Sequence, residues 1–234
     1  MRNEEPEAYQ IGNVPFLGLT IYLDSHPLIP RVETEWWAEL LTEEVRSAMK
    51  KVWPDPDVRP EDFLRGAPDL RVLDLCAGSG AIGCAILKHV PHAKVYFGEI
   101  DPAHEATIRK NILENKLDST RALVKMGDLF EPFGAMQFDF IAANPPYVPN
   151  GRELPASVQD FEPALALRAG PDGLALIRRI AKVLPHHLEK GGQAWIECDS
   201  AHAEAACALF TAEHFQASIH TDQYQRPRYL VIRW

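Results

Sequence analysis

Residues 71–83 read RVLDLCAGSGAIG, a short apolar run followed by a glycine-rich turn. The run predicts a buried strand over Arg71–Leu75, and a helical pattern, Ala81–His89, begins directly after the turn. Glycines let the backbone approach a ligand closely, and the first N–H groups of a helix can face that ligand. The stretch therefore predicts a strand–turn–helix unit with a ligand site at the end of the strand.

Strands and helices continue to alternate after this unit. Further strands are predicted at 94–97, 122–126, 138–143 and 194–197, and helices at 102–115, 174–188 and 201–214. This alternation implies a mostly parallel sheet that is covered by helices on both faces. Two runs, 218–221 and 229–234, predict a closing antiparallel pair at the edge of the sheet. The expected fold class is a doubly wound α/β domain.

The chain ahead of this alternation has a different pattern. Short β-like runs around Gly18 predict a small hairpin over Val14–Leu23. Apolar residues at helical spacing predict a helix from Glu33 to about Lys51. Four prolines within Trp53–Asp69 indicate a loop or linker.

Length and composition limit the class of protein. The chain has 234 residues, 46% of them hydrophobic, and a formal net charge of −9, which suits one large globular domain. We expect a cytoplasmic protein without a membrane partner, because no apolar run reaches membrane-helix length and the acidic N-terminus lacks a signal peptide's apolar core. The expected division is a loosely held polar segment, 1–15, and one domain, 16–234, made of a hairpin, helix and linker, 16–69, and an α/β core, 70–234.

The cysteines and histidines follow neither a disulfide nor a metal pattern. The four cysteines form no CxxC pair, and the nine histidines have no thiol or carboxylate at zinc-ligand spacing. We therefore expect no metal site.

Carboxylates around the glycine turn indicate its ligand. The G-x-G-x-x-G pattern at 78–83 matches a dinucleotide fingerprint, so an NAD-dependent oxidoreductase and a purely structural turn both stay open. Asp74 would repel a pyrophosphate, whereas S-adenosylmethionine carries an ammonium and a sulfonium and no phosphate. Glu99, at the end of the next strand, can accept both ribose hydroxyls. Asp128 follows the third strand, where it could bind an adenine amino group or cap a turn.

The tetrapeptide Asn144-Pro145-Pro146-Tyr147 directly follows the apolar strand 138–143. Its two prolines fix φ and prevent a helix, so the loop is stiff. The Asn144 side-chain oxygen and the Pro145 carbonyl can accept both N–H bonds of a planar NH2 group, which aims its nitrogen at a methyl donor. Tyr147 would pack against that planar group. The pattern favours methyl transfer to an amide or aromatic amine, and a rigid proline turn is the alternative.

Several motifs occur together and in order: LIPRVETE (28–35), DLCAGSG (74–80), GEID (98–101), NPPYVP (144–149), FEPALAL (161–167) and GPDG (170–173). From about Phe16 onward the chain resembles the PrmC/HemK family of release-factor glutamine N5-methyltransferases. The resemblance implies a class I S-adenosylmethionine-dependent methyltransferase domain, Rossmann-like, with a seven-stranded, mostly parallel sheet, an antiparallel C-terminal strand and a small N-terminal hairpin. It implies methylation of the GGQ glutamine of a class I peptide chain release factor, with S-adenosylhomocysteine as the second product.

The same resemblance assigns roles to individual positions. The expected cofactor-binding residues are Asp74, Cys76, Ala77, Gly78, Ser79, Gly80, Glu99, Asp128, Leu129 and Asn144. The expected catalytic residues, which would also clamp the substrate amide, are Asn144, Pro145, Pro146 and Tyr147. Arg31 and Glu33 would bind substrate from above the active site. An ion pair of Arg31 with Glu33 or Glu35 is the alternative.

The chain departs from the family pattern at several places. Cys76-Ala77 stands where many members have Gly-Thr, and Glu197-Cys-Asp stands where Glu-x-Gly is more usual. Members typically carry a helical N-terminal domain that grips the release factor, whereas only a short acidic segment precedes the motifs here. The tripeptide Gly191-Gly-Gln193 equals the expected target, and we expect it to be a turn between a helix and a strand.

Four other functions remain open. A ribosomal-protein glutamine methyltransferase would keep the cofactor and change the target protein. An adenine-N6 methyltransferase would share NPPY, but the acidic charge fits a nucleic-acid partner poorly. The acidic residues at the glycine turn and the NPPY motif make an NAD-dependent oxidoreductase a poor match to the sequence. A non-catalytic relic would bind only the cofactor or a partner. The oligomeric state is left open.

Overall fold

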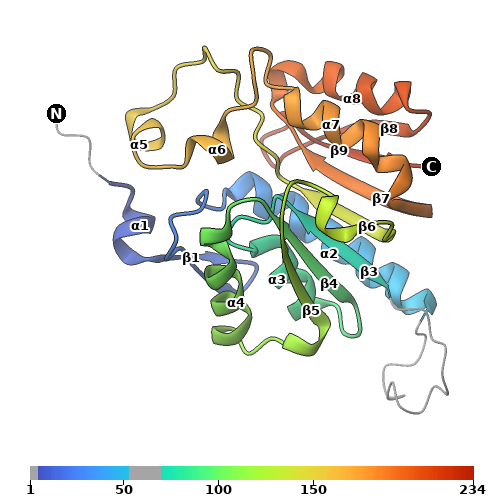
Figure 1. The fold of residues 1–234 in the computed structure, drawn as a ribbon, viewed down its shortest axis with the longest axis horizontal. Helices are drawn as coiled ribbons and strands as arrows, with labels where there is room; N and C mark the ends of the chain where they lie inside the picture. Colours follow the sequence, from blue (N-terminus) through green and yellow to red (C-terminus); the bar gives the residue numbers. More distant parts are fainter. Residues whose placement is uncertain (1–4, 53–69) are drawn as a thin grey trace.

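A computed structural model describes residues 5–52 and 70–234, and the predicted linker Trp53–Asp69 lies outside them. The centre of the molecule is a seven-stranded sheet (Figure 1). Its strands, in the order β5-β4-β3-β6-β7-β9-β8, are β3 (Arg71–Leu75), β4 (Lys94–Glu99), β5 (Ala122–Met126), β6 (Phe138–Ala143), β7 (Leu188–Glu197), β8 (Gln216–Thr221) and β9 (Pro227–Arg233).

The order of the strands places the ligand site. Strands β3 to β7 are parallel, and β9 runs antiparallel to both of its neighbours. From β3 the chain first adds strands on one side, β4 and β5, and then on the other, β6 and β7. Open α/β sheets bind ligands beyond the carboxyl ends of the strands at such a reversal. The predicted glycine turn and NPPY follow β3 and β6, which are direct neighbours.

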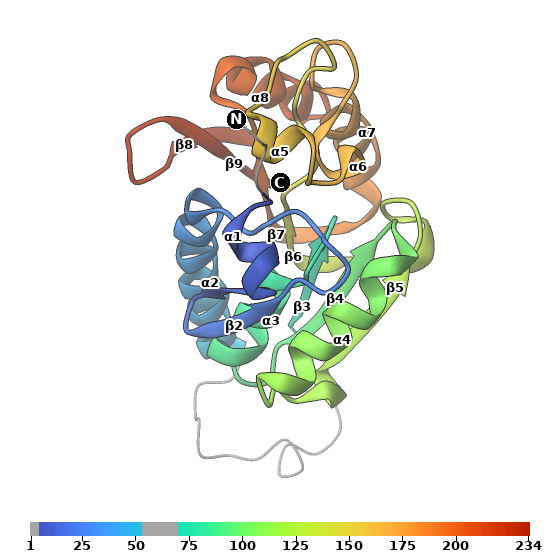
Figure 2. The ribbon, with the colours of Figure 1, turned by 90° about the vertical axis from the view of Figure 1, so that its left-hand side faces the viewer.

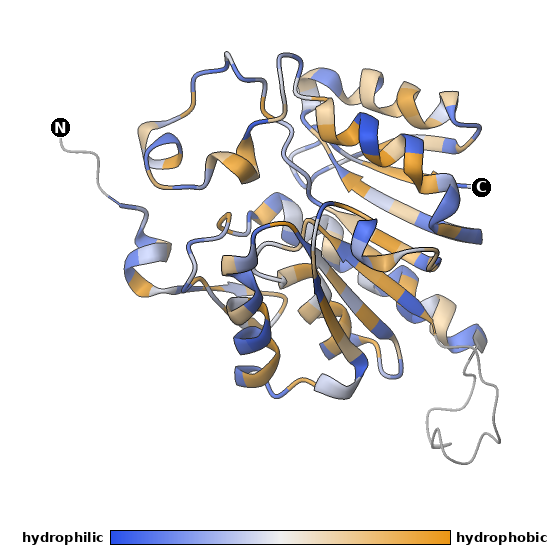
Figure 3. Ribbon diagram, in the orientation of Figure 1, coloured by the Kyte–Doolittle hydropathy of each residue, from blue (hydrophilic) through white to orange (hydrophobic). Residues whose placement is uncertain are grey.

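Helices cover both faces of the sheet (Figure 1). One face carries α2 (Val32–Val52), α3 (Ala81–His89) and α4 (Glu105–Glu114), and the other carries α7 (Ala175–Val183) and α8 (Ala203–Ala212). Successive side chains of a strand point to opposite faces, so Val72 packs into the first apolar core and Leu73 into the second. The central strands β3 and β6 are mainly apolar (Figure 3). In the described ranges, no helix combines the length and apolar character needed to cross a membrane.

The N-terminal hairpin packs on the α2/α3/α4 face. It consists of β1 (Asn13–Phe16) and β2 (Leu19–Tyr22), and it lies between α2 and α4 in Figure 2. The Asn111 side chain on α4 joins it to the glycine turn, because its Nδ2 donates to the carbonyls of Tyr22 (3.1 Å) and Ser79 (2.8 Å).

The chain before the hairpin is also packed. A short helix, α1 (Glu7–Ile11), buries Tyr9, whose hydroxyl donates to the carbonyl of Pro27 at 2.7 Å. The expectation of a loosely held segment over 1–15 is therefore wrong for its described part, and the hairpin already begins at Asn13. The short length and polar composition of this segment hid the single aromatic anchor that holds it.

Three predicted elements have different boundaries. The helix expected over 174–188 ends at Val183, because the 3-10 turn Leu184–His186 contains a proline. Strand β7 begins at Leu188, and its pairing with β6 shifts between Phe138 and Phe140. The GGQ tripeptide is therefore an irregular part of β7 rather than a turn before it. The helices expected from 102 and 201 begin as 3-10 turns, Pro102–His104 and Ser200–His202.

The remaining short helices lie between β6 and α7. They are α5 (Ala156–Gln159) and α6 (Ala164–Leu167), and they belong to the segment that carries FEPALAL. Strand-like pairing of Val148 with Arg168 joins the end of the NPPY segment to the end of α6. As a result, the two motifs lie together although they are separated in the sequence.

Candidate active site

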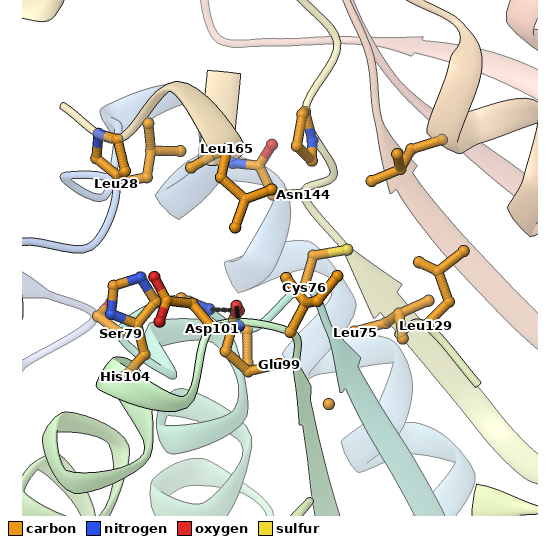
Figure 4. Close-up of a pocket in the computed structure, with 18 of the residues that line it drawn as sticks. Leu28, Leu75, Cys76, Ser79, Glu99, Asp101, His104, Leu129, Asn144 and Leu165 are labelled. Carbon is orange, nitrogen blue, oxygen red and sulfur yellow. Dashed lines mark hydrogen bonds between the residues drawn. The ribbon is translucent and has the colours of Figure 1, made fainter. Parts of the chain in front are cut away.

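A cavity of about 260 Å³ opens at the carboxyl ends of β3, β4 and β6 (Figure 4). In this view Asn144, Leu165 and Leu28 lie on one side of it, and Cys76, Glu99, Asp101 and His104 lie on the other. Of the predicted site residues, those on its wall are Cys76, Ala77, Gly78, Ser79, Glu99, Asp128, Leu129, Asn144 and Pro146. The topology therefore brings most of the predicted site to one place.

Glu99 is the most firmly oriented carboxylate on the wall. Its side chain accepts the N–H of Gly78 on Oε2 and that of Asp101 on Oε1, both at 2.8 Å. A carboxylate oxygen has two lone pairs, so each oxygen can accept a further hydrogen bond. Glu99 is 6% exposed, and that remaining surface borders the cavity. Its geometry suits a ligand with two neighbouring hydroxyl groups.

The glycine turn has a left-handed backbone at three positions, Cys76 (φ 59°), Gly78 (φ 55°) and Gly80 (φ 78°). Glycine adopts this conformation freely, whereas a residue with a side chain loses about 1–2 kcal/mol there. Cys76 therefore stands where glycine would fit the backbone better, which gives a physical reason for the glycine that the resemblance places there. Burial raises the pKa of the Cys76 thiol, with Glu99 the next contributor, so the group stays protonated.

Two predicted cofactor residues do not reach the wall. Asp74 is 1% exposed, and its Oδ2 accepts the N–H of Gly83 at 2.8 Å in the first turn of α3. Burial raises the pKa of Asp74 to about 8, against the opposing effect of the Gly83 hydrogen bond. Gly80 lies beneath the turn, where an added Cβ would be 3.1 Å from Cγ2 of Ile108. Both residues shape the turn from behind, and the acidic groups on the wall are Glu99, Asp101 and Asp128.

Asp128 carries an ion pair. Its Oδ2 accepts from Nη2 of Arg179 on α7 at 2.8 Å, and both residues border the cavity. The neighbouring Leu129 also has a left-handed backbone, with φ 48°. The side-chain contact of Asp128 is thus with a cation across the cavity wall, which the sequence spacing did not predict.

The NPPY loop is divided between the cavity and the interior. Asn144 and Pro146 border the cavity, whereas Pro145 and Tyr147 do not. The Asn144 Nδ2 donates to Oγ1 of Thr34 at 3.3 Å. The Tyr147 hydroxyl donates to Oε1 of Glu197 at 2.8 Å, so its ring is fixed at its far end. Packing of Tyr147 against a substrate therefore has no support in this arrangement.

The substrate-binding residues expected from the front motif also lie elsewhere. Arg31 forms an ion pair with the buried Glu162 of FEPALAL, which also accepts the N–H of Ile29 at 3.2 Å. The alternative pairing of Arg31 with Glu33 or Glu35 is therefore wrong. Glu33 pairs instead with Arg226 at 3.1 Å.

The front motif contributes to the wall through other residues, Leu28, Pro30 and Thr34. On the same side, Pro163, Leu165 and Ala166 border the cavity as well. Because Glu162 bonds to both Ile29 and Arg31, the two segments are joined above the site. The two family motifs form a single cover, which their separation in the sequence hid.

The polar residues of the site that were not predicted include Thr34, His104, Arg179 and Glu197. Thr34 lies inside a recognised motif, and Glu197 ends β7 at the same edge as the other site residues, so both had a signal in the sequence. His104 borders the cavity, and its Nδ1 lies 2.8 Å from Oγ of Ser25. Neither His104 nor Arg179 belongs to a motif, and no sequence signal indicates them. Within 5–52 and 70–234, no cluster of three histidine, cysteine or acidic residues could hold a metal ion.

Comparison with solved structures supports the fold. A methyltransferase from Pyrococcus furiosus superposes with a TM-score of 0.53 and 16% identity, over 83% of this chain and 96% of that one. The catalytic domain of hMettl16, solved with the MAT2A 3′UTR hairpin 6, superposes with a TM-score of 0.59 and 16% identity, over 93% of this chain and 76% of that one. At these identities the likeness shows the fold alone, which is the class I methyltransferase fold.

Comparison of sequences identifies the family. Residues 62–164 match the family model of the methyltransferase small domain. Release factor glutamine methyltransferases are 34% identical in Geobacter sulfurreducens, over 90% of this chain and 66% of the relative, and 32% identical in Mycolicibacterium smegmatis, over 97% and 74%. A ribosomal protein uL3 glutamine methyltransferase from Xanthomonas campestris pv. campestris is 34% identical over 80% of this chain and 54% of the relative. The chain thus spans about two thirds to three quarters of the release factor enzymes, and it belongs to the release factor glutamine methyltransferase family.

Proposed function

We propose that this chain transfers a methyl group from S-adenosylmethionine to the side-chain amide nitrogen of a protein glutamine, the glutamine of the GGQ motif of a class I peptide chain release factor. The observation that carries this proposal is the position of Asn144. Its side-chain amide borders a cavity whose opposite side bears Glu99 and the glycine turn. An acceptor for a substrate amide thus faces a site suited to a nucleoside with a cationic tail.

The residues of the cavity fit this cofactor. Glu99 would accept the two ribose hydroxyls, and the backbone of the turn 76–80 would border the ligand. Leu129 and Asp128 would contact the adenine, with Arg179 holding the Asp128 carboxylate in place. The acidic wall suits a ligand that carries an ammonium and a sulfonium. When bound, S-adenosylmethionine supplies a methyl group that is already activated by the positive charge on its sulfur.

The role of the NPPY loop is to orient a poor nucleophile. The nitrogen of a primary amide has a delocalised lone pair, so its reaction depends on being held in line with the methyl group. The Asn144 oxygen and the Pro145 backbone carbonyl would accept its two N–H bonds and stabilise the positive charge that develops on it. Pro146 fixes the shape of the loop. Tyr147 would act from behind by anchoring the loop to Glu197.

We also propose that the hairpin, α2 and the α/β core act as one catalytic unit, 16–234, without a boundary between 16–69 and 70–234. Thr34, from α2, and Leu28, from the segment before it, border the same cavity as the strand ends. Asn111 binds both the hairpin and the glycine turn. Removal of the N-terminal segments would therefore remove part of the site.

Methyl transfer to an intact release factor tests the function. The chain is incubated with S-adenosylmethionine labelled in its methyl group and with a release factor, and the GGQ peptide is then analysed by mass spectrometry. We expect one methyl group on the glutamine and none on a matched factor in which that glutamine is replaced by alanine. Absence of label from the intact factor and from the isolated GGQ peptide would refute the proposal.

The uL3 relative motivates one parallel assay. At 34% identity it is as similar to this chain as the Geobacter sulfurreducens enzyme, although the match covers less of it. Ribosomal protein uL3 is therefore offered under the same conditions. Faster labelling of uL3 than of the release factor would make uL3 the better candidate and would leave the proposed chemistry unchanged.

A further inference from the structure

Behind the cavity, the carboxylate of Glu197 joins two segments that are far apart in the sequence. Glu197 ends β7 and is 1% exposed. Its Oε2 accepts from Oγ1 of Thr34 and from Nε1 of Trp37, both at 2.7 Å, and its Oε1 accepts from the Tyr147 hydroxyl. Burial raises the pKa of Glu197, and these three hydrogen bonds act against that rise because they favour the ionised form.

The Trp37 contact fixes the direction of the hydrogen bonds. An indole N–H can only donate, so the oxygen that it contacts must be an acceptor. The hydroxyl of Thr34 bonds to that same Oε2, and because a carboxylate oxygen has no proton to donate, Thr34 is the donor, as Tyr147 is at Oε1. Thr34 then has only lone pairs left to offer to a third group.

That third group is the side-chain amide of Asn144, 3.3 Å from Thr34 Oγ1. Because Thr34 can only accept, the amide must present its NH2 group to Thr34 and keep its oxygen for another partner. In the reverse orientation, the amide oxygen would face a hydroxyl without a proton to give. The amide NH2 would then meet the N–H groups of a substrate amide, donor against donor.

We propose that Thr34 and Glu197 are positioning residues that fix the side-chain amide of Asn144 with its oxygen directed to the substrate. This inference rests on the proposed function for its effect on methyl transfer, whereas the orientation of the amide itself does not. Trp37 and Thr34 both donate to the Glu197 carboxylate. Thr34 can therefore only accept from Asn144, which fixes the orientation of the Asn144 amide. The threonine of the front motif thus acts on the asparagine of NPPY, although 110 residues separate them.

The first test replaces the hydroxyl of Thr34 with a methyl group of similar size, Thr34→Val. We expect kcat for the release factor to fall about tenfold or more, as for the loss of one hydrogen bond to a reacting group. The Kd of S-adenosylhomocysteine, measured by calorimetry, should stay within about threefold. Thr34→Ser, which keeps the hydroxyl, should restore most of the rate.

Thr42→Val is the matched control. Thr42 lies on the same helix and is equally buried, and its hydroxyl donates to the carbonyl of Ala38 within that helix. It should leave kcat unchanged. Equal kcat for Thr34→Val and Thr42→Val, with an active wild type, would overturn the inference and leave the proposed function intact.

A second test separates positioning from direct contact of Thr34 with substrate. In Glu197→Leu the threonine hydroxyl loses the acceptor of its proton, so it can donate to the Asn144 oxygen instead, which reverses the amide. We expect a loss of kcat similar to that of Thr34→Val, and a double variant no worse than the more severe single variant. Fully multiplicative losses would show that Thr34 acts independently of Glu197 and would contradict the inference.

The third measurement needs no substrate. The side-chain NH2 signals of Asn144 in a nitrogen-15 spectrum are assigned by their loss in Asn144→Asp. Thr34→Val should shift them and speed their hydrogen exchange, and Thr42→Val should not. Unchanged signals in Thr34→Val would overturn the inference. If the wild type fails to methylate any release factor but these signals change as expected, the proposed function fails and the orientation stands.

Discussion

The two walls of the cavity are built in different ways. The wall formed by the ends of β3 and β4 comes from one stretch, 74–101, and backbone N–H groups donate to the carboxyl groups of Glu99 on the wall and Asp74 behind it. The wall around Asn144 is assembled by side chains from separate parts of the chain. Thr34 and Asn144 are 110 residues apart, and Arg31 and Glu162 are 131 apart.

This difference separates two kinds of function. Backbone N–H groups of a turn are held by the strand and helix on either side, so the first wall is a fixed surface suited to a cofactor common to many enzymes. The second wall depends on hydrogen bonds and ion pairs between side chains, and a single substitution can remove any one of these contacts. We therefore expect substitutions in the first wall to change cofactor affinity or stability, and substitutions in the second to change the rate of transfer.

The largest effect is expected for Asn144→Ala. It removes an acceptor for the substrate amide, so kcat should fall about 100-fold or more, as when one group that stabilises a transition state is lost. The Kd of S-adenosylhomocysteine should change less than tenfold. Asn150→Ala, an exposed asparagine in the following loop, is the control in the same kinetic and calorimetric assays. A loss of cofactor affinity as large as the loss of kcat would assign Asn144 to the first wall.

Glu99→Gln should produce the opposite pattern. The glutamine amide presents an N–H group toward the backbone N–H of Gly78 or Asp101 and carries no charge, so the Kd of S-adenosylmethionine should rise about 10-fold to 100-fold. At saturating cofactor, kcat should stay within about threefold. Glu105→Gln, on the surface of α4, is the matched control. A lower kcat at saturation, with unchanged Kd, would remove the distinction between the walls.

Gly83→Ala tests the packing beneath the first wall. An added Cβ would lie 2.3 Å from Cε1 of Phe97, whose side chain is fully buried. Overpacking of this kind costs about 1–3 kcal/mol, more than alanine gains over glycine in a helix. The free energy of unfolding in urea should fall by that amount, whereas Gly151→Ala, with open space around it, should change it little. Equal stability of both variants would show that the turn is not tightly supported.

The last prediction concerns Asp74 and the pH dependence of stability. Its folded-state pKa of about 8 lies above the ordinary value of about 4, so the folded chain keeps a proton that the unfolded chain releases. The stability this contributes is present at low pH and is lost as pH rises through about 8. The slope is at most about 1.4 kcal/mol per pH unit. Asp74→Asn keeps an acceptor for Gly83 and should flatten this dependence in urea unfolding at pH 6, 7 and 8. Parallel curves would contradict the raised pKa.

Much of the fold could be predicted from the sequence because strands and helices are indicated by local patterns of apolar and turn-forming residues. The runs at 71–75, 122–126 and 138–143 became strands with the predicted limits, since each is apolar and bounded by turn residues. The errors lie where a local signal is weak. The tripeptide at 191–193 was assigned to a turn because of its glycines, but β7 pairs with β6 on both sides of this irregular stretch, at Leu188 and at Gln193.

The sequence by itself determined the class of fold, the glycine turn, Glu99 and the asparagine of NPPY, because each follows a strand at a spacing that parallel sheets impose. Only the tertiary structure decided the partners of these residues: Arg179 for Asp128, Glu162 for Arg31, and Thr34 with Glu197 for the NPPY loop. The physical reason is distance along the chain. Spacing reports which residues share an element, whereas contacts between side chains 51 to 163 residues apart depend on how helices and loops pack over the sheet.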